Sequence, residues 1–404
     1  MLPCCVGYLK RNNKMMNKEQ NIFPFIERLL DGAEVEWKKL GEVLKRTKGT
    51  KITAKQMRTM HKSGAPVKIF AGGKTFAFVD FDDIPEKDIN RNPSVIVKSR
   101  GIIEFEYYDK PFTHKNEMWS YYSDNKSINI KYVYYYLKHQ ESFFQKIGSK
   151  MQMPQISLPD TEKFKIPIPP FAVQEEIVRI LDKFTTLEAE LEAELDCRKR
   201  LYEYYRNQLL SFNMLNRGGQ RLNNVNIESL EEVVEIKRGR RLVRKELSGT
   251  GHYAVFQNSM TPLGYFDNSN VDGDSTFIIS AGAAGEIGYS SVDFWAADDI
   301  YYFIPSAMVC SKYLYYFLLT KQSAIKGQVR RASVPRLAKS AFAKIQIPIP
   351  SLAEQHRIVS ILDKFDTLVN SISEGLPKEI ELRRKQYEYY RNQLLSFPEH
   401  KVSA

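Results

Sequence analysis

Residues 166–187 have the sequence IPIPPFAVQEEIVRILDKFTTL, and residues 347–368 repeat it as IPIPSLAEQHRIVSILDKFDTL, with 15 of the 22 positions identical. A second block, YEYYRNQLLSF, occurs unchanged at residues 202–212 and 387–397. The copies lie 181 residues apart in the first block and 185 in the second, so the second copy holds four additional residues between its blocks. The segments that precede the two copies differ. The sequence therefore predicts a repeated scaffold that carries two divergent inserts.

Each repeat begins with Ile-Pro-Ile-Pro, whose alternate prolines exclude a helix and favour an extended connector. Apolar residues then recur at spacings of three and four, which is typical of a coiled-coil seam. In the first copy we expect a helix over residues 174–212, about 58 Å long at ~1.5 Å per residue. The candidate seam residues are Ile177, Leu181, Phe184, Leu187, Leu191, Leu195, Ile358, Leu362, Phe365, Leu368 and Ile372.

The second long helix is expected to be interrupted at Gly375-Leu376-Pro377. Four inserted residues shift a seam, and Pro377 removes a backbone donor and kinks or breaks a helix. The order of parts is globule, helix, globule, helix. If the first helix leads from one globule to the other, the second must run back, which predicts antiparallel helices and a pseudo-twofold relation between the copies.

Both inserts have the composition of mixed helix and sheet. The second, from residue 227, aligns with the first, from residue 37, and the tyrosine-rich segments 132–137 and 313–318 again lie 181 residues apart. We expect most of these tyrosines to be core residues, although tyrosines can also stack on bases. In the first insert, strands are predicted in 67–73, 75–81, 94–108 and 118–122, and a helix over 130–144.

The fold class is therefore α+β, with two mixed globular domains and two long antiparallel helices that form a coiled coil. The predicted boundaries are a disordered segment 1–16, a first globule with a helical lead-in over 17–165, a connector and helix over 166–215, a second globule over 216–346, and a second connector and helix over 347–404.

The composition of the 404-residue chain favours a polyanionic partner. The formal net charge is +11 and the pI about 9.2, which suits nucleic acid without requiring it. The four cysteines, Cys4, Cys5, Cys197 and Cys310, are not spaced as a zinc site or a disulfide framework. No apolar run approaches the ~20 residues of a membrane span, and we expect a cytoplasmic protein.

Two variable globules, each followed by an Ile-Pro-Ile-Pro segment and a helix with the pattern QxxIVxILDKFxxL, resemble the specificity subunit of type I restriction-modification systems. The residues that carry the resemblance are Gln174, Ile177, Val178, Ile180, Leu181, Asp182, Lys183 and Phe184, and Gln355, Ile358, Val359, Ile361, Leu362, Asp363, Lys364 and Phe365. The resemblance implies that each globule recognises one half of a bipartite double-stranded DNA target. It also implies that the coiled coil sets the spacer between the halves.

The same resemblance implies that this chain is not a catalyst. Methylation would belong to two modification subunits bound along the helices, and ATP-driven cleavage to restriction subunits. The chain itself would bind no cofactor, whereas its partners would use S-adenosylmethionine, ATP and Mg. The interruption at 375–377 departs from a continuous helix and makes the two docking faces unequal.

The best candidate DNA contacts are basic side chains, because Lys and Arg anchor phosphates and Arg also pairs with guanine. A solvated charged face is the alternative interpretation. The candidates are Lys45, Arg46, Lys48, Lys51 and Lys55 in the first globule, and Lys237, Arg238, Arg240, Arg241, Arg244, Lys245, Arg330, Arg331 and Arg336 in the second.

Two glycine-rich stretches mimic nucleotide-binding motifs. AGGKT at 71–75 has Lys68 where a phosphate-binding loop needs glycine, and AGAAGEIG at 281–288 leads into a strand where a dinucleotide site needs a helix. No catalytic or metal-binding group of residues is indicated. The alternatives are a chain that itself modifies or cleaves DNA, and a coiled-coil scaffold that binds only protein.

Overall fold

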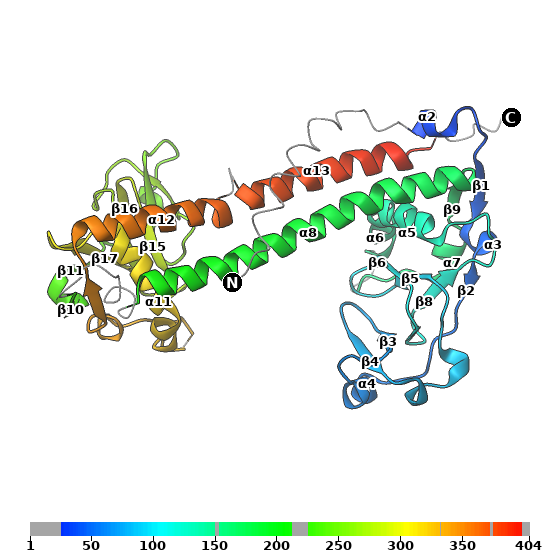
Figure 1. The fold of residues 1–404 in the computed structure, drawn as a ribbon, viewed down its shortest axis with the longest axis horizontal. Helices are drawn as coiled ribbons and strands as arrows, with labels where there is room; N and C mark the ends of the chain where they lie inside the picture. The colour runs from blue at the N-terminus through cyan, green and yellow to red at the C-terminus, as the bar shows by residue number, and fades with distance from the viewer. Residues whose placement is uncertain (1–25, 150–152, 212–224, 332, 372–374, 398–404) are drawn as a thin grey trace. The chain divides into compact units, whose positions relative to one another are not determined.

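The computed structural model describes residues 26–149, 153–211, 225–331, 333–371 and 375–397 (Figure 1). The predicted disordered segment 1–16 and the candidate seam residue Ile372 lie outside these ranges. The chain forms two compact units, of which the first is built from two separate segments and the second from the stretch between them. Unit 1 contains residues up to Glu190 and from Glu381 onward, and unit 2 contains Leu191–Ile380.

The globule of unit 1 is built on a four-stranded and a three-stranded sheet. The first is antiparallel throughout, and the second pairs its central strand in parallel with its last strand. In spatial order, the first has β2 (Lys45–Arg46), β8 (Trp119–Tyr122), β5 (Ser94–Lys98) and β6 (Glu104–Tyr108), and the second has β4 (Phe76–Val79), β3 (Val67–Phe70) and β7 (Phe112–His114). Helices α5 (Ile130–His139) and α6 (Glu141–Gly148) pack on the first sheet.

Unit 2 repeats this topology strand for strand, including the parallel pair in the smaller sheet. Its first sheet has β11 (Val234–Arg238), β17 (Ile300–Pro305), β14 (Ser275–Ile279) and β15 (Ile287–Ser290), and its second has β13 (Gly264–Phe266), β12 (Tyr253–Phe256) and β16 (Phe294–Ala296). Helix α11 (Ser311–Gly327) takes the place of α5 and α6. The inserts are therefore two copies of one fold, as the alignment predicted.

The strands predicted in the first insert contain β3, β4, β5, β6 and β8. Strands β2 and β7, which are only two and three residues long, were not predicted. The predicted helix 130–144 is divided at Gln140, which caps α5 and begins α6. Both glycine-rich stretches are loops between strands, with Gly73 and Gly282 at positive φ.

The two Ile-Pro-Ile-Pro segments form strands β9 (Lys165–Ile168) and β18 (Gln346–Ile349). Each pairs antiparallel with the strand that opens its unit, β1 (Glu36–Lys39) or β10 (Asn226–Ser229). Two-stranded sheets have only edge strands, and edge strands tolerate the missing N–H of proline. The predicted extended connectors are confirmed, and each ties the end of a globule to its beginning.

The long helices are α8 (Phe171–Leu209), α12 (Leu352–Asn370) and α13 (Gly375–Leu395). The second long helix is interrupted, as predicted, but just before the predicted residues. Helix α12 ends at Asn370, and Gly375-Leu376-Pro377 are the first residues of α13, where proline is tolerated. Gly375 has φ +76°, and a Cβ there would lie 2.8 Å from the carbonyl oxygen of Leu368. Glycine is therefore required where the two helices meet.

The remaining helices are short. They are α2 (Ile26–Leu30), α3 (Leu40–Val43), α4 (Ala54–Met60), α7 (Leu158–Glu162) and α10 (Leu230–Val233), with single 3₁₀ turns η1 (Phe81–Asp83), η2 (Glu86–Asp88), η3 (Arg244–Glu246) and η4 (Lys339–Ala341). Helix α2 belongs to the predicted helical lead-in, and it is followed by Asp31 and Gly32, which both adopt positive φ.

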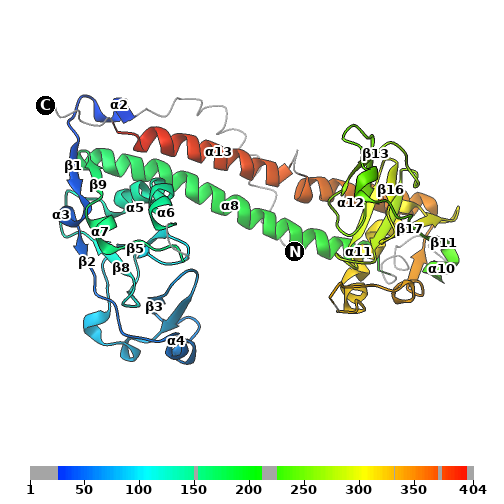
Figure 2. The ribbon, with the colours of Figure 1, turned by 180° about the vertical axis from the view of Figure 1, so that it is seen from behind.

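Each unit is completed by residues from the other repeat. In unit 1, Phe184 of the first repeat stacks on Tyr390 of the second at 5.4 Å, and Glu188 forms an ion pair with Arg384 at 2.6 Å. These contacts make α8 and α13 antiparallel there, as both views of the ribbon show (Figure 2). In unit 2, Phe365 of the second repeat stacks on Tyr205 of the first at 5.7 Å.

The last described residues of the chain belong to the core of unit 1. Leu394, Leu395 and Phe397 are buried in the same cluster as Ile26 and Leu30. This placement agrees with the prediction that the second long helix runs back. The tyrosines predicted as core are buried, with Tyr132, Tyr135 and Tyr136 in unit 1 and Tyr313 and Tyr316 in unit 2.

Candidate nucleic-acid interface

A buried glutamine fixes each globule to its long helix. The side chain of Gln174 donates hydrogen bonds to the carbonyls of Pro169 (2.8 Å) and Ser127 (3.0 Å) and accepts one from the N–H of Asn129 (2.8 Å). In unit 2, Gln355 makes the same three bonds to Pro350, Met308 and Cys310, each at 2.8 Å. Both glutamines are completely buried, so every polar atom of the amide has a fixed position.

We call this attachment of a globule to its long helix the joint, and in each unit an aspartate of the helix also takes part in it. Asp182 accepts hydrogen bonds from Lys131 (2.7 Å) and Tyr135 (2.5 Å). Asp363 accepts the corresponding bonds from Lys312 (2.9 Å) and Tyr316 (2.6 Å).

The tyrosine of each joint stays protonated and donates to its aspartate. Burial, and then the hydrogen bond to the carboxylate, raise the pKa of both Tyr135 and Tyr316. These tyrosines were predicted as core residues, but their hydrogen bonds to the aspartates were not. The signal was present, because Lys131 and Tyr135 recur after 181 residues, as the helix motif does.

The basic candidates of unit 1 lie on β2 and on the chain that follows it. Lys45, Arg46, Lys48, Lys51 and Lys55 are all exposed. Lys45 forms an ion pair with Asp124. For the side chains of Lys48, Lys51 and Lys55, the structure shows no hydrogen bond or ion pair within its described ranges. The segment therefore presents free cations beside the first sheet.

The corresponding candidates of unit 2 begin on β11 and extend through η3. Lys237, Arg238, Arg240, Arg241, Arg244 and Lys245 are exposed. Lys237 pairs with Glu235 at 3.2 Å, and Arg238 donates through Nε to the carbonyl of Asp298 at 2.7 Å. The other four side chains have no ionic or hydrogen-bonding partner among the residues that the structure describes.

A second exposed basic loop of unit 2 contains Arg330, Arg331 and Arg336. Backbone hydrogen bonds of 2.9 and 3.1 Å close this loop between Arg330 and Arg336. The backbone of Arg336 forms an isolated antiparallel β-bridge with Ala281, and the N–H of Gly282 donates to the carbonyl of Pro335 at 3.2 Å. The glycine-rich loop and the arginine loop thus support each other.

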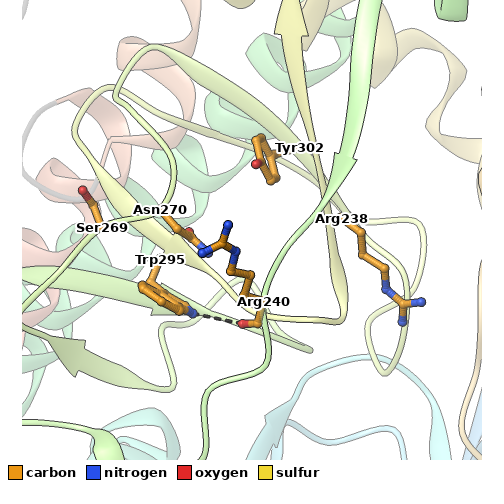
Figure 3. Close-up of a pocket in the computed structure, with 6 residues that line it drawn as sticks. All are labelled: Arg238, Arg240, Ser269, Asn270, Trp295 and Tyr302. Atoms are coloured by element: carbon orange, nitrogen blue, oxygen red, sulfur yellow. Dashed lines mark hydrogen bonds between the residues drawn. The ribbon is translucent and has the colours of Figure 1, made fainter.

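A pocket of about 240 Å³ opens beside the β11 segment (Figure 3). It is lined by Arg238, Arg240, Ser269, Asn270, Trp295 and Tyr302. The guanidinium of Arg240 lies next to the amide of Asn270, whereas the side chain of Arg238 points away from these groups. The Trp295 indole donates to the carbonyl of Arg240 at 3.1 Å.

Unit 1 has a different side chain at the position of Arg240. Thr50 donates its N–H to the carbonyl of His114 (2.8 Å), as Arg240 does to the carbonyl of Ala296 (2.9 Å). Thr50 is buried, and a polar cluster lies beside it, in which Thr47 Oγ1 is 2.9 Å from Nε2 of His114. Burial lowers the pKa of this histidine. The two globules therefore share a backbone arrangement here but present different chemistry.

The family model described as "Type I restriction modification DNA specificity domain" matches residues 33–196 and 223–382, which contain both units' sheets and joints. The chain belongs to this specificity family. A type I restriction enzyme specificity subunit of Escherichia coli is 35% identical to it over 93% of this chain and 97% of the relative.

Two solved structures have the same fold. The type I restriction-modification S subunit from M. genitalium matches with a TM-score of 0.62 and 17% identity, over 91% of this chain and 98% of the other. A chain from a study of complex assembly in the type I R-M system matches with a TM-score of 0.57 and 14% identity, over 93% and 99%. At these identities the match supports the fold alone.

The candidate seam residues of this specificity-family chain differ in how deeply they are buried. Ile177, Leu181 and Phe184 are buried in the core of unit 1, and Ile358 and Leu362 in that of unit 2, with Phe365 packed against it. Leu187, Leu191 and Leu195 are partly buried.

One candidate does not occupy the seam. Leu368 is 43% exposed, and the adjacent Val369 is buried in its place at 2%. The heptad pattern was extended to the very end of α12, where the interruption at Gly375 displaces the next turn.

No helix in the described parts of this specificity-family chain is long and apolar enough to cross a membrane.

Proposed function

We propose that the chain is the DNA-recognition subunit of a type I restriction-modification complex and does not itself catalyse a reaction. Each globule recognises one half of a bipartite duplex target. The observation that carries this proposal is the duplicated fold, in which identical joints hold two globules that differ in their exposed cations. A protein-only scaffold would have no need for two different basic loops on one repeated framework.

The chemistry of the basic loops suits this role. Lysine and arginine bind phosphate without sequence preference, and arginine also forms bidentate bonds to guanine in the major groove. Half-sites recognised from one side of B-DNA lie about 34 Å apart or a multiple of that distance. A continuous helix such as α8 is stiff enough to impose a fixed spacing between two readers.

The remaining parts of the proposal concern partners. Two modification subunits would dock on the long helices, and restriction subunits would join the complex. S-adenosylmethionine, ATP and Mg would be bound by those subunits. The modification subunit would extract the target base from the duplex to methylate it.

The decisive experiment exchanges residues 37–155 for the corresponding globule of another family member, in cells that contain the modification subunits. Methylome sequencing should then show a change in one half-site and an unchanged second half. A change in both halves would contradict the model of two independent readers. Failure to bind any duplex, even with the modification subunits present, would favour the scaffold alternative.

A second experiment tests the spacer. Lengthening both long helices by one or two turns should change the number of unread base pairs and leave both half-sites unchanged. An unaltered spacer would remove the helices' role in setting it.

A further inference from the structure

The backbone of Arg240 is held in place on every side. Its N–H donates to the carbonyl of Ala296 at 2.9 Å, and its own carbonyl accepts from the Trp295 indole at 3.1 Å. The preceding Gly239 donates to Ile300 at 2.9 Å, and a Cβ on it would lie 2.2 Å from the carbonyl oxygen of Ala297. Such a fixed backbone lowers the entropy cost of using the attached side chain for recognition.

The side chain of Arg240, in contrast, is uncommitted. It is exposed, and none of the described residues forms a hydrogen bond or ion pair with its guanidinium. The neighbouring Asn270 is not available to contact a base in the same way. The Asn270 amide donates to the carbonyl of Ala296 (2.9 Å) and accepts from its N–H (2.7 Å), so both ends of the amide are engaged with the backbone.

The pocket therefore contains the Arg240 guanidinium, which has no bonded partner among the described residues, beside groups that are held in place (Figure 3). Asn270 forms one wall through its committed amide, and Trp295 and Tyr302 provide aromatic surface. A guanidinium fork matches the O6 and N7 acceptors of guanine, and this is the commonest base-specific contact in protein–DNA complexes. The nearby Arg241, Arg244 and Lys245 remain available for phosphates.

We propose, on the basis of the proposed DNA-recognition function, that Arg240 recognises a guanine in the half-site bound by unit 2. Unit 1 has the buried Thr50 at this position and lacks such a reader there. A phosphate contact is the alternative, and it would give no dependence on the base sequence. Arg240 is thus a specificity-determining residue that distinguishes the two globules.

The test uses the full chain in complex with its modification subunits, and a duplex that carries the target found by methylome sequencing. Each guanine of the unit 2 half-site is replaced in turn by 7-deazaguanine, which lacks the N7 acceptor. At one position the replacement should weaken binding by about 5-fold to about 100-fold. Arg240→Ala should weaken binding to the unmodified duplex by a similar factor and should be insensitive to that replacement.

Arg240→Lys separates a base contact from a phosphate contact, and it keeps a long cationic side chain if the alanine variant folds poorly. A base contact predicts that lysine does not restore discrimination at the sensitive position. Recovery of binding by lysine, with an even loss across all sequences in Arg240→Ala, would overturn the proposal in favour of a phosphate contact. Lys344→Ala, an exposed cation beside β18, is the matched control and should leave the 7-deazaguanine effect intact.

Two other outcomes would also overturn the inference. One is a wild-type complex that is insensitive to 7-deazaguanine throughout the unit 2 half-site. The other is a change in the half-site of unit 1 when Arg240 is replaced. A wild-type complex that binds no duplex with sequence preference would instead contradict the proposed function itself.

Discussion

The joints and the basic loops of the two units have diverged to very different extents. At the joints, Gln174 and Gln355 make the same three hydrogen bonds, and Asp182 and Asp363 bind the same pair of side chains. Beside the loops, a buried threonine in one unit corresponds to an exposed arginine in the other. The contacts that attach each globule to its long helix are alike, whereas the side chain beside the basic loop differs in both chemistry and exposure.

The basic loops of the two units are alike in the pairing of their cations. Outside the loops, both units use lysines in ion pairs, such as Lys62 with Asp80 in unit 1 and Lys326 with Glu286 in unit 2. Within the loops, Lys48, Lys51 and Lys55 of unit 1 and Arg240, Arg241, Arg244 and Lys245 of unit 2 have no such partner in the described ranges. Because internal pairing weakens attraction to a polyanion, both loops should contribute to the sequence-independent affinity.

The largest effect should come from removing a joint glutamine. Gln174→Ala and Gln355→Ala each leave one N–H and two carbonyls without partners in a buried site. Each should lower the free energy of unfolding by about 3 kcal/mol, measured by urea denaturation. Because the geometry is the same, the two losses should agree within about 1 kcal/mol. A clearly unequal pair would show that the joints are not equivalent.

A smaller loss is expected at the aspartates. Asp182→Asn and Asp363→Asn remove the ion pair with lysine but keep the shape of the side chain, which should cost about 1 to 2 kcal/mol. Thermal unfolding can measure it. Asp196→Asn is the matched control, since Asp196 pairs with Arg200 on the exposed face of α8. If the control lost as much as the joint variants, the joint would have no special role.

The salt dependence of DNA binding tests the loops themselves. Neutralising Arg241, Arg244 and Lys245 together should make binding less sensitive to salt. The negative slope of log K against log salt concentration should decrease in magnitude by up to about 3. The matched triple variant of Lys48, Lys51 and Lys55 should do the same for unit 1. An unchanged slope in one triple variant would remove that loop from the interface.

The smallest expected difference between the units is in how their stability depends on pH. Burial lowers the pKa of His114 and of His139, both in unit 1, and the charges of Arg46 and Arg391 lower them further. Below an unfolded pKa of about 6.5 the unfolded chain binds more protons than the folded unit, so the stability of unit 1 falls as the pH falls.

Hydrogen exchange can follow each unit separately. Unit 2 has Ala296 and Thr320 in place of these histidines, so from about pH 7 to about pH 5.5 protection should decrease more in unit 1. Intrinsic exchange rates cancel when the two units are compared at one pH. A larger decrease in unit 2 would contradict the assignment of the sensitive groups.

The architecture was predictable from sequence because the repeat is long and its offset constant. The interruption at Gly375 was also predictable, since proline and glycine act locally. Part of the joint left a signal as well, because Lys131 and Tyr135 recur at the same offset as Asp182. The bonds of Gln174 left none, because its partners are backbone groups. The error at Leu368 has a similar origin, as a heptad pattern cannot show where a helix ends. DNA contacts depend on docking geometry, which no residue pattern specifies.

The exchange of elements between repeats has a consequence for synthesis on the ribosome. Unit 2 is contiguous between Leu191 and Ile380 and can fold once that stretch has emerged. Unit 1 cannot be completed until Leu394, Leu395 and Phe397 arrive. At about 5–20 residues per second, the first globule waits roughly 10–40 s for its last helix. Translation therefore makes the second reader first, and a chain stopped just short of its end would carry one finished unit and one open core.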